Sequence, residues 1–117
     1  MHQASLENRF EVLEIALQAA GTAITIVGRV PTKSRSLADQ VVRSASSVPA
    51  NLAEGHGRTG KGRLHHYRIA YGSAKEVEVH LQLLVGAGVV KQHQTAEALE
   101  LFDRVRAMTW RLLNPRP

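Results

Sequence analysis

The sequence predicts an all-α protein, folded as an antiparallel up-and-down four-helix bundle that takes up residues 1–117 as a single domain. Three observations predict this fold class. In four segments apolar residues recur at alternating steps of three and four, which lines one face of an α-helix. Clusters of glycine and proline separate those segments. No segment reads convincingly as a strand, and helices of about 20 residues joined by short loops pack with their neighbours antiparallel.

The first predicted helix covers about residues 6–29. Its expected core stripe consists of Phe10, Leu13, Leu17, Ala20, Ile24 and Val27. Gly28 and Pro31 mark its end, because proline lacks the amide hydrogen that would continue a helix.

The second predicted helix covers about residues 36–58. Its expected core stripe consists of Leu37, Val41, Ala45, Val48 and Leu52. Pro49 lies inside this helix and should kink it, because it removes the hydrogen bond to the carbonyl of Ala45. A second stripe on the same helix is wholly polar: Arg43, Ser47, Asn51, Glu54 and Arg58.

The third and fourth predicted helices cover about residues 62–86 and 95–113. The third should bury Tyr67, Ala70, Ala74, Val77, Leu81 and Leu84, and the fourth should bury Ala98, Phe102, Val105, Thr109 and Leu112. Thr95 is the expected N-cap of the last helix. Gly86 and Gly88 close the third helix, and Asn114 and Pro115 stop the fourth.

The net charge of +5 lies entirely in the middle of the chain. Residues 29–75 carry nine Lys or Arg residues against Asp39 and Glu54, a net +7. A basic segment of this kind is the expected footprint for nucleic acid or another polyanion. The alternative, a solvated surface that keeps the protein soluble, stays open.

One line of basic residues should run along the third helix, nearly opposite its core stripe. Such a row can follow a phosphate backbone. No aromatic residue is interleaved with it, so base stacking on this face is not predicted. The candidate nucleic-acid-binding residues are Arg58, Lys61, Arg63, His65, Arg68 and Lys75.

Motifs for catalysis or cofactor binding lack the context that their chemistry needs. The run Gly55 to Gly60 fits the dinucleotide pattern GxGxxG, but the residues before it have helix spacing where a strand is required. No Glu is followed by His at the third position, as in di-iron bundles. No nucleophile elbow is present. We therefore predict no enzyme activity, no cofactor and no metal site.

Cysteine is absent, which fits a reducing compartment. The first residues are polar and acidic, unlike a signal peptide. The longest apolar stretches are interrupted by Thr and Gly and fall short of the roughly 20 residues of a membrane span. We expect a soluble cytoplasmic protein with no membrane partner.

A shared motif links the second and third predicted helices to a known family. The stretch LADQVVRSASSVPANLAEGHGRTGKG, followed by YRIAYGSAKEVEVHLQL, resembles the bacterial four-helix-bundle proteins encoded by intervening sequences in large-subunit ribosomal RNA genes. The resemblance spans about residues 37–85. Its motif residues here are Arg43, Ser47, Pro49, Asn51, Glu54, Gly55, Gly57, Arg58, Gly72, Ser73 and Glu76.

That resemblance implies the bundle fold and, for some members, a ring of five subunits. The chain is more distantly similar to the accessory protein of diversity-generating retroelements, a pentameric bundle with a basic surface that works with a reverse transcriptase and RNA. We interpret one set of polar residues as a structural network between the second and third helices, with a direct ligand or RNA role as the alternative. The set is Arg43, Asn51, Glu54, Arg58, Ser73 and Glu76.

The sequence therefore favours a non-enzymatic, homo-oligomeric binding or scaffolding protein. RNA or a nucleoprotein is its candidate partner through the basic surface. The alternative is a purely structural protein–protein interaction module with no nucleic-acid role.

Overall fold

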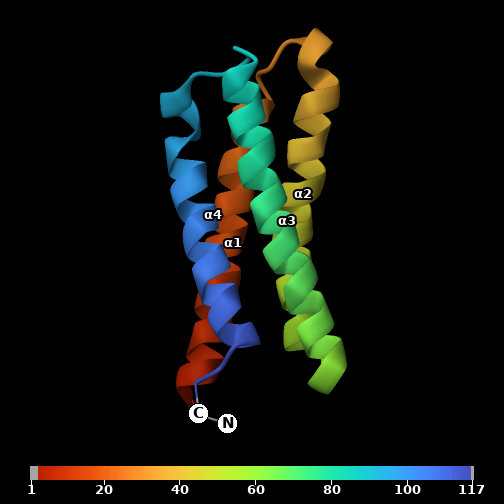
Figure 1. The fold of residues 1–117 in the computed structure, drawn as a ribbon, viewed down its shortest axis with the longest axis vertical. Coiled ribbons are helices and arrows are strands. Elements are labelled where there is room, and N and C mark those ends of the chain that lie inside the picture. Colours follow the sequence, from red (N-terminus) through yellow and green to blue (C-terminus); the bar gives the residue numbers. More distant parts are fainter. Residues whose placement is uncertain (1–2, 117) are drawn as a thin grey trace.

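The computed structural model describes residues 3–116, with side chains from residue 6 onward. Four helices form an antiparallel bundle: α1 (Gln3–Val27), α2 (Arg35–His56), α3 (Gly60–Gly86) and α4 (Gln92–Leu113), with a short 3-10 turn η1 (Thr32–Ser34) before α2. The described residues contain no strand. The start of α1, the α2–α3 turn and the end of α4 lie at the same end of the bundle (Figure 1). The predicted fold class is confirmed.

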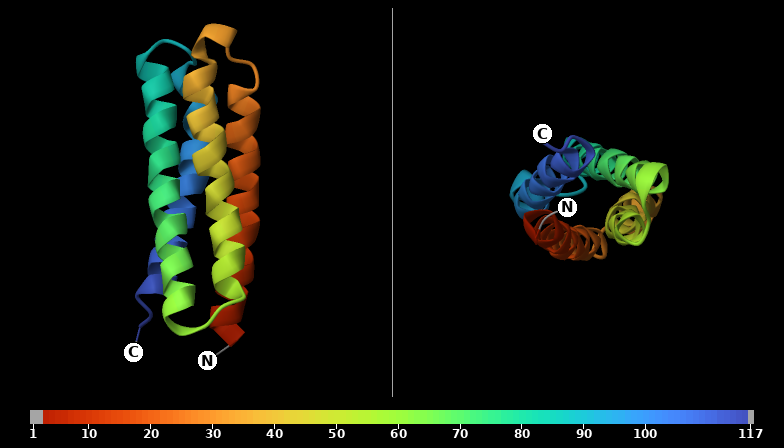
Figure 2. Two further views of the ribbon diagram at one scale, coloured as in Figure 1. Left: turned by 90° about the vertical axis from the view of Figure 1, so that its right-hand side faces the viewer. Right: turned by 90° about the horizontal axis from the view of Figure 1, so that it is seen from below.

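The four helices surround one core, and each packs against two neighbours. The contacts join α1 to α2, α2 to α3, α3 to α4, and α4 back to α1. Seen along its axis, the molecule is a closed ring of four helices (Figure 2). Its principal extents are 48 × 23 × 18 Å.

The predicted core stripes of α2, α3 and α4 face this interior. Their members are buried, except that Leu37 and Leu112 are half-buried at the margin. Tyr67 and Phe102 are the largest fully buried side chains. Because one apolar row per helix fills the space between neighbours, these three helices dock through the faces that the periodicity predicted.

The predicted core stripe of α1 is wrong for half of its members. Phe10 is 72% exposed and Leu17 57% exposed, and Ile24 also faces outward. The buried face consists mainly of smaller residues: Val12, Ile15, Ala16, Ala19, Ala20, Ala23 and Val27. Both rows have helical spacing, and the alanine-rich row is the one buried because its small side chains leave room for larger ones from adjacent helices.

α4 begins three residues before the predicted start, so Thr95 is not its N-cap. Thr95 is fully buried, and its hydroxyl donates to the carbonyl of Gln92 at 2.9 Å. The cap is built by Gln94, whose side-chain oxygen accepts from the Lys91 amide at 2.8 Å. A side chain that reaches back in this way satisfies an amide left free at a helix start.

Helix α2 continues through Pro49, whose ring is buried. The helix ends at His56, and α3 starts at Gly60, which adopts a positive φ of 56°. A left-handed backbone of this kind favours glycine. The run that fits GxGxxG is therefore a helix end and an interhelical turn, as its spacing indicated.

One stretch of α1, Leu6–Val27, is long and apolar enough to cross a membrane by length and composition alone. The expectation that every apolar stretch is too short for a span is therefore wrong for this segment, which is apolar on average although Thr, Gly and Glu residues interrupt it. The core helix of a soluble protein meets the same description. In the bundle, one side of α1 packs against α2 and α4.

Candidate nucleic-acid interface

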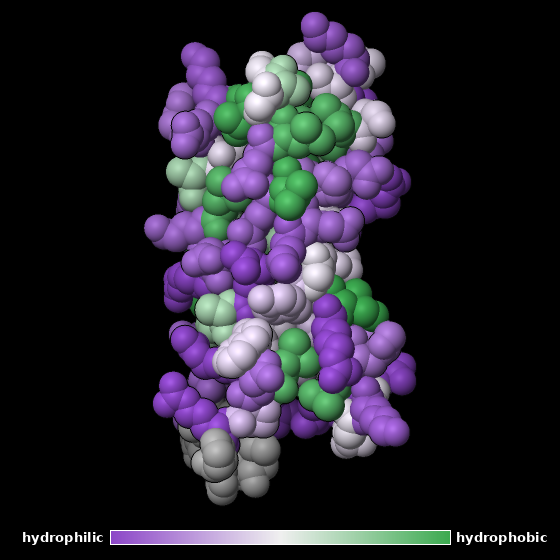
Figure 3. Space-filling view, viewed as in Figure 1, coloured by the Kyte–Doolittle hydropathy of each residue, from purple (hydrophilic) through white to green (hydrophobic). Residues whose placement is uncertain are grey.

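Four of the six predicted nucleic-acid-binding residues form a row along α3. Lys61, His65, Arg68 and Lys75 are all exposed. None of them forms an ion pair within the described residues. The face that carries α3 and α4 is hydrophilic over much of its area, with separate apolar patches (Figure 3). The row therefore offers cationic groups to solvent, and we call these four residues the basic row.

The other two predicted binding residues are engaged within the protein. Arg58 donates to the Glu54 carboxylate at 2.9 Å, with both side chains about half exposed. Arg63 is half-buried and donates from Nε to the carbonyl of Gly55 at 3.2 Å. It lies off the basic row because its position turns it toward the end of α2. The six predicted nucleic-acid-binding residues therefore do not form one surface, because four lie in the basic row and two are bound to other groups of the protein.

A chain of polar side chains connects α2 to α3. The Ser47 and Ser73 hydroxyls lie 2.8 Å apart. Asn51 donates to the carbonyl oxygen of Ser47 at 2.9 Å and to its hydroxyl at 3.0 Å, and its own side-chain oxygen lies 2.9 Å from Nδ1 of His66. Two predicted network members, Asn51 and Ser73, thus meet through Ser47. His66 completes the chain and was not predicted.

The remaining predicted network residues lie outside this hydrogen-bond chain. Arg43 is exposed on α2. Glu54, on α2, pairs with Arg58 in the turn that follows this helix. Glu76 is exposed on α3, with its carboxylate 3.9 Å from Nε2 of His80. Charged side chains this long reach solvent and partners a few residues away in the chain, which costs less than burial between helices.

At the end of the bundle His56 joins three helices, an arrangement that spacing did not indicate. Its ring contacts the Tyr67 hydroxyl at 2.8 Å and the carbonyl of Arg9 at 3.0 Å. Burial lowers the pKa of His56 and raises the pKa of Tyr67. The Tyr67 ring lies against Gly55, where an added Cβ would sit 2.7 Å from a ring carbon. This gives the motif glycine at position 55 a packing role.

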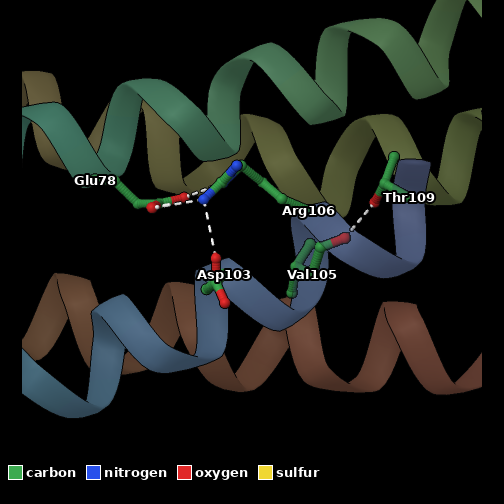
Figure 4. Close-up of polar contacts among 5 residues, drawn as sticks. All are labelled: Glu78, Asp103, Val105, Arg106 and Thr109. Atoms are coloured by element: carbon green, nitrogen blue, oxygen red, sulfur yellow. Dashed lines mark hydrogen bonds and ion pairs between the residues drawn. The ribbon is translucent and has the colours of Figure 1, made fainter. Parts of the chain in front are cut away.

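A second cluster ties α3 to α4. Arg106 binds the Glu78 carboxylate through two nitrogens, one of them at 3.1 Å, and reaches Asp103 at 3.0 Å (Figure 4). Hydrogen bonding to Glu78 is the main cause of a raised pKa for Arg106, and the nearby Tyr71 hydroxyl adds to the rise. This cluster fixes the register of the two helices beside the basic row.

No group of three or more His, Asp or Glu side chains is placed to hold a metal ion in residues 3–116. An open groove between α1 and the start of α4 is lined largely by apolar and neutral residues, with Arg29 and Glu97 as its charged members.

Comparison with known proteins places the fold and the family. The solved structure of a protein with unknown function from the S23 ribosomal protein family of Bacteroides thetaiotaomicron is similar, with a TM-score of 0.83 at 17% sequence identity. The match covers 91% of this chain and 97% of that one. Among curated proteins no similar sequence is found. The profile of a family described as "23S rRNA-intervening sequence protein" matches residues 8–111. The chain therefore belongs to the 23S rRNA-intervening sequence protein family.

Proposed function

We propose that this protein is a non-enzymatic, homo-oligomeric binding or scaffolding protein of the cytoplasm that contacts RNA through the basic row. The observation that carries the proposal is the exposed line of Lys61, His65, Arg68 and Lys75 on one helix. Each phosphate that such a row neutralises releases counterions, which gives affinity without sequence preference. The descriptions of the family and of the solved relative, which mention 23S rRNA and a ribosomal protein family, support RNA as the polyanion.

Assembly is supported by the outward face of α1. Leu6, Phe10, Leu17 and Ile24 are exposed at helical spacing along one side of that helix. Large apolar residues gathered in one row on a surface mark contacts with other proteins. A second copy of the chain is the partner we propose, and the ring of five that the resemblance implies for some family members is the proposed assembly.

RNA binding is tested by titrating the protein into a labelled generic RNA between about 50 mM and 200 mM salt. Affinity should fall steeply as salt rises. The double variant Lys61→Glu/Arg68→Glu should bind more weakly, and its log–log salt slope should be shallower by about two, one for each lost phosphate contact.

The matched control is Lys33→Glu/Arg35→Glu, which makes the same charge change at exposed positions near the other end of the bundle. It should bind RNA much as the native protein does. Equal weakening of both variants would mean that net charge, not the basic row, governs binding. Absence of binding at low salt would overturn the RNA proposal.

The second candidate function is a structural module that contacts only protein. Exposed apolar residues on α3, Val79 and Leu83, favour it because they add to those on α1. This candidate function predicts a stable oligomer that does not bind RNA at low salt. Light scattering, combined with the same RNA titration, separates the two functions.

A further inference from the structure

Trp110 is the only tryptophan in the chain, and 53% of it is exposed on α4. A large aromatic ring buries much apolar area when it packs, so leaving it in solvent forgoes that stabilisation. Trp110 makes none of the hydrogen bonds or aromatic pairs that its side chain could form within the described residues. Its ring is therefore free to receive a partner.

The register of α3 and α4 puts Trp110 on the side of the basic row. Trp110 is one helical turn beyond Arg106, so the two side chains share a face of α4. Arg106 points to α3, where it binds Glu78 (Figure 4). Because the two helices are antiparallel, moving from Arg106 to Trp110 on α4 corresponds to moving from Glu78 toward Lys75 and earlier residues on α3.

Those earlier residues of α3 combine aromatic and cationic groups. Tyr71 is half-buried near Arg106, and the Lys75 ammonium lies 5.9 Å from the centre of its ring. Lys75 and Arg68 are exposed and are separated by two helical turns, about 10 Å along the axis. The Tyr71 ring of α3 is half-buried, and α4 adds the exposed ring of Trp110 on this side of the basic row.

We propose that Trp110 is a stacking platform for an unpaired base of single-stranded RNA, whose phosphates lie along Arg68 and Lys75. The inference deepens the proposed function and rests on it. An aromatic face beside a basic track is the combination that holds single strands, because every base has a π face. Bases in a duplex are already stacked and cannot offer that face, so this surface selects for unpaired RNA.

Intrinsic fluorescence tests the proposal directly, since all tryptophan emission comes from position 110. A short oligouridylate should quench that emission on binding. The same strand paired with oligoadenylate of equal length should bind through its phosphates and leave the emission nearly unchanged. Anisotropy of end-labelled oligouridylate then gives affinities for variants that lack the tryptophan.

Trp110→Leu should bind oligouridylate roughly 5- to 150-fold more weakly, the loss expected for one stacked base. Its affinity for the duplex should not change. Trp110→Phe should recover part of the loss, because a smaller aromatic ring still stacks. His93→Leu removes an exposed ring from the opposite end of α4 and is the control, with unchanged affinity for both RNAs.

The outcomes distinguish failure of this inference from failure of the proposed RNA-binding function. Suppose that RNA binding depends on salt, that oligouridylate does not quench the emission, and that Trp110→Leu binds oligouridylate as tightly as the native protein. That result overturns the stacking platform and still supports RNA binding by the basic row. Absence of binding to either RNA overturns both. Emission that shifts on dilution of the protein alone, without RNA, overturns the inference because another subunit then covers Trp110.

Discussion

The Nε2 atom of His56 lies 3.0 Å from the main-chain oxygen of Arg9, a residue 47 positions earlier in the chain. A carbonyl oxygen can only accept, so Nε2 carries the hydrogen and the neutral ring accepts at Nδ1 from the Tyr67 hydroxyl. One uncharged imidazole thereby joins α1, α2 and α3 at the end of the bundle that holds the α2–α3 turn.

This arrangement predicts a loss of stability in mild acid. Burial, with the Arg9 and Arg63 charges, lowers the pKa of His56 below its ordinary value of 6.5. The unfolded chain therefore binds this proton more readily than the folded chain, and the free energy of unfolding falls as the pH drops below about 6.5. The loss levels off once the pH is below the pKa of the folded protein. Urea unfolding from about pH 8 to pH 5 measures it.

Replacing the ring isolates its contribution. His56→Gln should show a shallower fall of unfolding free energy with acid than the native protein, while His93→Gln, at an exposed position, should keep the native slope. Identical slopes for His56→Gln and the native protein would show that His56 does not control this dependence.

Gly55→Ala should destabilise the bundle by about 1–3 kcal/mol. The added methyl group would lie 2.7 Å and 2.8 Å from two carbons of the buried Tyr67 ring, so the ring must move. Gly72→Ala is the control, because an added Cβ there meets nothing within 4 Å, and it should stabilise α3 by up to about 1 kcal/mol. Denaturant unfolding compares them, and equal stabilities would refute the packing role of Gly55.

The Glu78–Arg106 pair should show measurable coupling. Its side chains are only 18% and 25% exposed, and the contact is bidentate. A double-mutant cycle with Glu78→Gln and Arg106→Gln should give about 1–2 kcal/mol. The comparison pair, Glu54 and Arg58, is about half exposed and should give no more than about 0.5 kcal/mol. A Glu78–Arg106 coupling as small as that of the comparison pair would contradict the prediction.

The outward row of α1 should control assembly if the proposed oligomer forms. Phe10→Ser/Leu17→Ser removes two exposed apolar side chains and should lower the mass measured by light scattering. Ile69→Ser removes an exposed apolar side chain from α3 and is the control, with unchanged mass. An unchanged mass for the α1 variant would place the interface elsewhere.

The fold was readable from the sequence because α2, α3 and α4 each have a single apolar face. α1 has two apolar faces with helical spacing. From periodicity alone, the face with Phe10 and Leu17 was predicted to be buried, and the alanine-rich face was not. Which face is buried depends on the space that the neighbouring helices leave, and that is a property of the whole bundle. α2 continues through Pro49 as one helix, as its predicted range 36–58 implied, and the kink expected at Pro49 stays a prediction.

The polar residues were predicted less well than the core. Spacing placed Asn51 and Ser73 on facing helices, and they do meet through Ser47. It gave no sign of contacts such as that between His56 and Arg9, which are distant in sequence. Spacing also cannot show whether a long side chain such as Glu76 turns to a neighbouring helix or to solvent.

An even number of helices brings the first turn of α1 and the last turn of α4 to the same end of the molecule as the start of α3, which carries Lys61 (Figure 1). A tag, dye or surface tether attached at either place would stand close to the positive charges and to Trp110, and would compete with a polyanion for them. The loop between α3 and α4, at Gly86 to Gly88, is at the opposite end and offers exposed positions for immobilisation that keep that side of the protein open.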